Sequence, residues 1–67
     1  MKKTFAEKLK KLRTDIGLTQ TGLAMEFNVS LKTISHWETG YSEPSIKQLI
    51  TIANFFDITL DELVGRE

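Results

Sequence analysis

Apolar residues recur along the chain at the spacing of one helical face, in five stretches that short polar breaks separate. The first stretch predicts a helix from about Phe5 to Ile16. Thr4 and Glu7 have the spacing of a capping box at its start, and Gly17 is expected to end it in the left-handed conformation. The apolar positions expected to face the core are Phe5, Leu9, Leu12 and Ile16.

Four further helices are predicted, each preceded by a residue that favours the N-cap position. Their ranges are about 20–27, 31–39, 46–56 and 60–64. The N-caps are Thr19, Ser30, Ser45 and Thr59. Gln48 and Glu62 follow the third and fourth caps by three residues and complete two capping boxes. Asn28 and Gly40 tolerate a positive φ and are expected to end the second and third helices.

These helices are expected to share one apolar core with the first. Its expected members are Leu23, Ala24, Phe27, Val29, Ile34, Trp37, Leu49, Ala53 and Phe56. Val29 is interpreted as a buried plug in the turn, and space decides which of Ile46, Ile50 and Ile52 joins the core. Phe55 lies at the rim of the core or in an exposed patch that serves a dimer. The pattern therefore predicts an all-α fold of five helices in a single domain over residues 1–67.

The composition excludes several classes of function. The 67 residues include no cysteine and one histidine, so neither a disulfide nor a zinc site is expected, and no cofactor motif is present. The chain has no phosphate-cradling glycine loop and no frame for a catalytic triad, so we predict that it is not an enzyme. No apolar run approaches the roughly 20 residues of a membrane span, and the charged start is unlike a signal peptide. A cytoplasmic protein is expected.

The formal net charge is zero, which argues against a nucleic-acid binder, but the charges are unevenly distributed. Residues 1–14 hold six lysines and arginines against one acidic residue, whereas residues 55–67 hold four acidic residues against one arginine. A neutral total can therefore hide a basic face. The lysines of the first helix are most simply a solvated face that keeps the protein soluble.

The segment from Thr19 to Gly40 is the most informative about function. Two short helices are joined there by a tight turn, and Ala24 is a small residue at the place where two helices would cross closely. The second of these helices is apolar on one side and polar on the other. An α-helix with a polar face of this kind fits the DNA major groove, where base edges offer donors, acceptors and methyl groups.

The ordered set of short motifs in this chain resembles the Cro/CI, or XRE, family of phage-repressor-like helix-turn-helix regulators. The residues that carry the resemblance are Gly17-Leu18-Thr19-Gln20, Leu23-Ala24, Val29-Ser30, Thr33-Ile34-Ser35, Trp37-Glu38-Thr39-Gly40, Pro44-Ser45 and Leu60-Asp61-Glu62-Leu63. The resemblance covers about residues 5–65. It implies a compact, lambda-repressor-like domain of five helices that binds a near-palindromic DNA operator, usually as a homodimer.

The resemblance also implies roles for particular residues. Base-reading positions of the family fall on Leu31, Lys32, Thr33 and His36. Phosphate contacts fall on Thr39 and on the loop with Tyr41 and Ser42. Gln20 occupies a position that contacts the DNA backbone or braces the recognition helix, and Arg13 with Glu38 matches a structural salt bridge of some members.

Each of these side chains also has a simpler interpretation. Lys32, Thr33 and His36 would then be solvated surface residues, Gln20 would only begin a helix, and Leu31 would only touch the core. Two departures from the family pattern matter here. Gly22 replaces a good helix former, at a cost of about 1 kcal/mol, and Lys32 is the only lysine or arginine of the third helix.

The sequence supports two classes of function. The first is sequence-specific binding of double-stranded DNA and transcriptional regulation, with repression by a dimer that forms in solution or only on the operator. The second is a protein-interaction module, such as an antitoxin or an antagonist of another regulator. The only segment after the last helix is Gly65-Arg66-Glu67, and so short a tail favours the first class.

Overall fold

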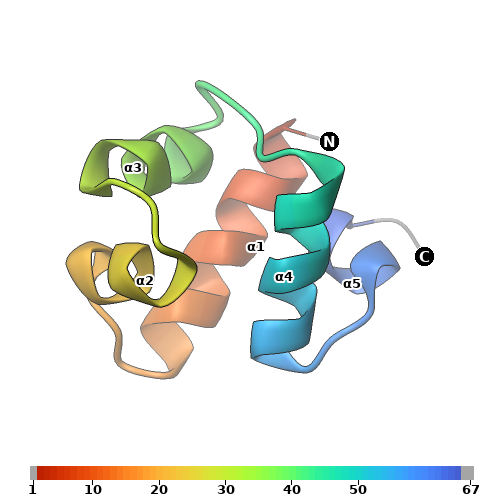
Figure 1. Cartoon of the computed structure of the whole chain (residues 1–67). Coiled ribbons are helices and arrows are strands. Elements are labelled where there is room, and N and C mark those ends of the chain that lie inside the picture. Colours follow the sequence, from red (N-terminus) through yellow and green to blue (C-terminus); the bar gives the residue numbers. More distant parts are fainter. Residues whose placement is uncertain (1, 66–67) are drawn as a thin grey trace.

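The computed structural model describes residues 2–65, except for the side chains of residues 2 and 3, and this part of the chain contains five helices and no strand. The helices are α1 (Lys2–Asp15), α2 (Gln20–Phe27), α3 (Leu31–Thr39), α4 (Ile46–Phe56) and α5 (Leu60–Val64). The predicted all-α architecture is confirmed. In Figure 1, α2 and α3 lie on one side of the central α1, and α4 and α5 lie on the other.

The N-caps predicted for α2 to α5 are confirmed. The hydroxyl of Thr19 accepts from the backbone N–H of Gly22, and that of Ser30 accepts from Thr33. Both capping boxes at α4 and α5 are complete. Because each cap satisfies backbone N–H groups that a helix start leaves without partners, it fixes where the helix begins.

The capping box predicted at Thr4 and Glu7 is wrong, because α1 begins at Lys2 and Thr4 lies inside the helix. The other end of α1 forms a Schellman turn, in which Gly17 has a φ of 76° and donates to the carbonyl of Thr14. In the same turn Leu18 donates its N–H to the carbonyl of Arg13.

This turn also overturns one core assignment. Ile16 follows the end of α1 and is exposed, although its spacing predicted a core position. Leu18 packs against the core instead, because the Schellman turn directs the residue after the glycine back onto the helix.

A single apolar cluster joins all five helices. Its buried members are Phe5, Leu9, Leu23, Ala24, Ile34, Trp37, Leu49, Ile52, Ala53 and Leu63. Of the three isoleucines left open for α4, Ile52 is buried, whereas Ile46 and Ile50 remain 72% and 47% exposed. Val29 packs against this cluster but is only partly buried, whereas the sequence predicted a buried residue. Phe55 is 39% exposed, and its ring makes an edge-to-face pair with that of Phe27, with 5.2 Å between the ring centroids.

Candidate nucleic-acid interface

The joint between α2 and α3 is short because α2 ends in a tight left-handed turn. Asn28 adopts a φ of 55° there, and Val29 donates its N–H to the carbonyl of Ala24 at 3.0 Å. The side chain of Ala24 is buried, so a larger residue would press on the neighbouring helix. The turn and the alanine therefore hold α2 and α3 as one helix-turn-helix unit.

The orientation of α3 is fixed by what it buries. Ile34 and Trp37 are in the core. The helical repeat of 3.6 residues then directs Lys32, His36 and Thr39 to the opposite side, where Lys32 and Thr39 are exposed and His36 is half-buried. We call these three residues the outward face of α3. Its side chains offer an ammonium group, an imidazole and a hydroxyl, which are the donors and acceptors used to contact bases and phosphates.

The other residues predicted to contact DNA flank this face. Leu31 is exposed at the start of α3, while Thr33 is half-buried. The hydroxyl of Thr33 lies 2.8 Å from that of its N-cap Ser30, which engages it in the cap. Ser42 follows α3 in the loop and donates its backbone N–H to the carbonyl of His36 at 3.3 Å.

Ser35 is a residue of this region to which the sequence interpretation gave no contact. It is half-buried and lies three positions after Lys32, on the flank of the outward face next to Leu31. The helical period contained the signal, because positions three and four apart lie on the same side of a helix.

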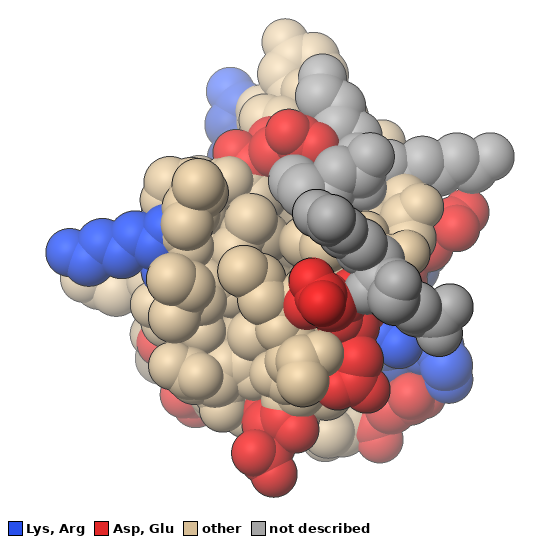
Figure 2. Space-filling view, turned by 90° about the vertical axis from the view of Figure 1, so that its right-hand side faces the viewer, with Lys and Arg blue, Asp and Glu red and all other residues tan. Residues whose placement is uncertain are grey.

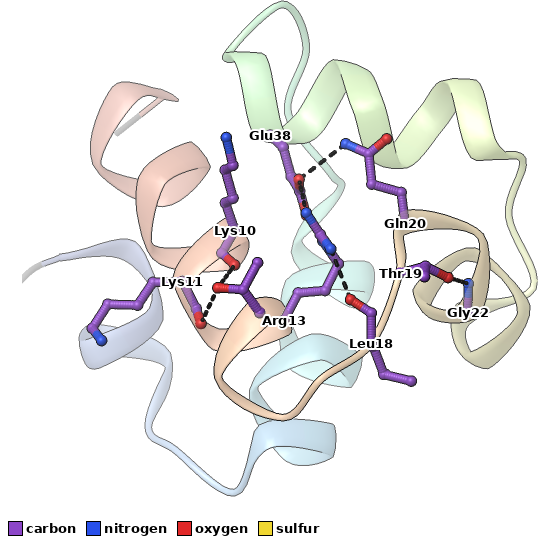
Figure 3. A network of polar contacts seen from close by, with 9 residues as sticks. Lys10, Lys11, Arg13, Leu18, Thr19, Gln20, Gly22 and Glu38 are labelled. Carbon is purple, nitrogen blue, oxygen red and sulfur yellow. Dashed lines mark hydrogen bonds and ion pairs between the residues drawn. The ribbon is translucent and has the colours of Figure 1, made fainter.

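A buried ion pair fastens α3 to α1. Arg13 Nε donates to Glu38 Oε2 at 2.6 Å and Nη2 donates to Oε1 at 3.1 Å, in the two-pronged geometry typical of arginine and carboxylate (Figure 3). The side chains are 11% and 2% exposed. The hydrogen bond to Glu38 raises the pKa of Arg13 above its ordinary value. Arg13 Nη1 also donates to the carbonyl of Leu18 at 2.7 Å.

Gln20 joins the same carboxylate from α2. Its amide nitrogen donates to Glu38 Oε1 at 3.0 Å, so Glu38 receives hydrogen bonds from two other helices. Figure 3 shows the three side chains converging, with the amide oxygen of Gln20 directed away from Glu38. The structure thus contains the bracing contact that the sequence left as one of two alternatives for Gln20.

Other kinds of site are not found in the part of the chain that the structure describes. It contains no group of three or more histidine, cysteine, aspartate or glutamate side chains that could hold a metal ion. Among residues 2–65 there is also no helix long and apolar enough to cross a membrane.

Comparison with known proteins identifies the family. The model of the helix-turn-helix family HTH_3 matches residues 9–63. The chain is 46% identical over 63 residues to the transcriptional activator BcrR of Enterococcus faecalis, covering 94% of this chain and 31% of BcrR. It is 37% identical over 60 residues to RstR, a cryptic phage CTXphi transcriptional repressor of Vibrio cholerae serotype O1, covering 90% of this chain and 54% of RstR. This chain therefore spans about a third to a half of the length of these two relatives.

A solved structure agrees with the sequence match. The fold superimposes on a transcriptional regulator from Listeria innocua with a TM-score of 0.92 and 34% identity, over 100% of this chain and 63% of that one. BcrR, RstR and the Listeria innocua protein are all named as transcriptional regulators. The chain belongs to the helix-turn-helix family of Cro/CI-type, or XRE, transcriptional regulators.

Proposed function

We propose that this domain binds double-stranded DNA sequence-specifically, with α3 in the major groove, and regulates transcription. The observation that carries the proposal is the polar outward face of α3, on which Lys32 and Thr39 are exposed and His36 is half-buried. Ile34, Trp37 and the carboxylate of Glu38 hold the other side of the helix in place. The fixed orientation of α3 supports base recognition, because discrimination between bases requires side chains held in a defined position against the groove.

The proposed contacts divide by chemistry. Lys32 donates to a guanine edge or to a phosphate, and His36 meets a base edge. Leu31 touches a thymine methyl group, and Thr33 contacts the DNA after its hydroxyl leaves the cap. Thr39 and Ser42, at the end of α3 and in the loop, donate to phosphates, as does Gln20 if its amide also reaches the backbone of the DNA. Ser35 is added to this set from its position beside the outward face.

A homodimer on a near-palindromic operator is part of the proposal. Ile46 and Ile50 of α4 and Leu60 of α5 are exposed apolar side chains. Figure 2, which faces the side of α4 and α5, shows a broad uncharged surface with acidic side chains beside it. Burying these apolar side chains between two copies would be favourable. A two-fold pair on DNA would need its two α3 helices about 34 Å apart, one turn of DNA.

Repression by occupancy is the mode of regulation that we favour. A dimer over a promoter would exclude polymerase, and this needs no surface beyond the DNA contacts and the dimer face. RstR is named a repressor, whereas BcrR is named an activator, so membership of the family does not decide between repression and activation. Action on DNA would place the protein in the cytoplasm.

The experiment is a binding selection from random duplexes, followed by fluorescence anisotropy on the enriched site at several salt concentrations. We expect a near-palindromic site, and a loss of affinity in Lys32→Ala. If Lys32 contacts a phosphate, the slope of log K against log salt falls by about 1; if it contacts guanine, discrimination at one base pair relaxes.

Lys11→Ala is the matched control, since Lys11 is an exposed lysine of α1 that forms a surface ion pair with Asp15 at 3.1 Å. It should bind as the wild type does. Absence of any binding at about 50 mM salt, where the phosphate attraction is strong, would refute the proposal and favour the protein-interaction module.

A further inference from the structure

Two aromatic side chains stack on each other beside the outward face of α3. The ring centroids of His36 and Tyr41 are 4.5 Å apart, with 47° between the ring planes. This separation is at the short end of the range for attractive aromatic pairs. Tyr41 is 74% exposed, so its ring does not belong to the core. The stack is thus a tilted contact between the exposed ring of Tyr41 and the half-buried ring of His36, on the proposed DNA-binding side.

The backbone after α3 fixes this stack. Gly40 has a φ of 79° and reverses the chain at the end of the helix. Tyr41 then donates its N–H to the carbonyl of His36 at 3.0 Å, and Ser42 donates to the same oxygen at 3.3 Å. The hydroxyl of Thr39 donates to it as well. The loop is therefore tied to the very residue whose ring Tyr41 covers.

From this geometry we infer that Tyr41 is a positioning residue for His36, a role that rests on the proposed function. A neutral imidazole has one donor nitrogen and one acceptor nitrogen, so the base it selects depends on the orientation of the ring. Because the tilted Tyr41 ring packs against the imidazole, it restricts the rotamers of His36 before DNA is bound. The family resemblance alone places the loop at the phosphates, whereas the stack gives Tyr41 a part in base discrimination.

The test compares base preferences of Tyr41→Phe, Tyr41→Ala, His36→Ala and the double variant Tyr41→Ala/His36→Ala. The base pairs read by His36 are those at which His36→Ala loses preference. We expect Tyr41→Phe to keep this preference, since it keeps the ring. Tyr41→Ala should weaken it about three- to tenfold, the range expected when one side chain loses its ordering. The double variant should match His36→Ala.

Two results would overturn the inference. Equal weakening on all duplexes by Tyr41→Phe and Tyr41→Ala, with base preference unchanged, would mean that the hydroxyl contacts a phosphate. A loss of preference on Tyr41→Ala that persists in the His36→Ala background would mean that the two residues are not coupled. Urea midpoints of Tyr41→Phe and Tyr41→Ala should agree with the wild type, because the Tyr41 ring is exposed.

Failure of the proposed function is recognised separately. A wild-type protein that enriches no duplex refutes DNA recognition before any variant is compared. Proton NMR of the free protein tests the stack itself, because the tyrosine ring current shifts the His36 ring protons. The shift should change in Tyr41→Ala and persist in Tyr41→Phe. With DNA binding and the stack both present, an unchanged preference in Tyr41→Ala refutes only the positioning role.

Discussion

Replacing Glu38 by alanine removes the carboxylate on which α1 and α2 converge. Arg13 would keep its charge and its hydrogen bond to the carbonyl of Leu18, but would lose both bonds to Glu38. Breaking one side of a buried ion pair typically costs about 3–5 kcal/mol. Because the Arg13 side chain is 11% exposed, water can approach it, and we expect the lower end, about 3 kcal/mol.

That loss is large for a chain of this size. A domain of 67 residues has a total stability of about 3–10 kcal/mol. Each kcal/mol shifts the Tm by about 4–8 °C in a small domain, so the Tm should fall by more than about 10 °C. Urea unfolding followed by the fluorescence of the buried Trp37 measures the free energy directly, with thermal circular dichroism as a second probe.

The matched control removes both charges together. Arg13→Met/Glu38→Leu fills the space with apolar side chains and leaves no buried charge, so it should lie within about 1 kcal/mol of the wild type. Two results would refute the reasoning. One is a loss below about 1 kcal/mol in Glu38→Ala, which is the range of a surface pair. The other is a double variant as unstable as the sum of the single variants.

Three further predictions concern the helix ends. Ser30→Ala removes the N-cap of α3 and should cost about 1 kcal/mol in urea unfolding; an unchanged midpoint would contradict this. Gly22→Ala should stabilise the fold by about 0.5 kcal/mol, because alanine has the higher helix propensity. This gain exceeds the cost of moving the Leu18 methyl group that a Cβ would meet at 3.3 Å. A lower urea midpoint would mean that this methyl group cannot move. The hydrogen bond from the backbone N–H of Thr59 lowers the pKa of Glu62. The ionised Glu62 therefore stabilises the fold above the ordinary glutamate pKa of about 4.3, and this stabilisation is lost as the pH falls through the lowered pKa. Glu62→Gln should therefore lose less stability than the wild type between pH 7 and pH 3, and parallel pH profiles would contradict it.

Cap chemistry explains why α2 to α5 could be predicted from the sequence. Thr19 and Ser30 each accept a hydrogen bond from the N–H three residues ahead, so the signal is local and visible in the order of residues. The start of α1 carries no such constraint. Threonine and glutamate at 4 and 7 are equally compatible with a helix interior, and no breaker stands between Lys2 and Thr4, so the helix extends to Lys2.

The candidate interface could also be predicted only in part from the sequence. The outward face of α3 follows from the helical period once Ile34 and Trp37 are assigned to the core. The ion pair of Arg13 with Glu38 joins residues 25 positions apart, and only the family resemblance suggested it. The stack of His36 on Tyr41 had no signal in the sequence, because it depends on how the loop folds back after Gly40.

Folding brings basic residues of the first segment close to an acidic residue of the last segment. Lys8 and Lys11 of α1 line the same open groove as Glu62 of α5, and Lys8 contributes to the lowered pKa of Glu62. Part of the positive charge of the first segment is thus offset by negative charge of the last segment. Lys32 remains the only lysine or arginine on α3. Since non-specific affinity comes from phosphate neutralisation, we expect this domain to bind random DNA weakly. Under the proposed function, its affinity for a specific site would then depend mainly on base contacts.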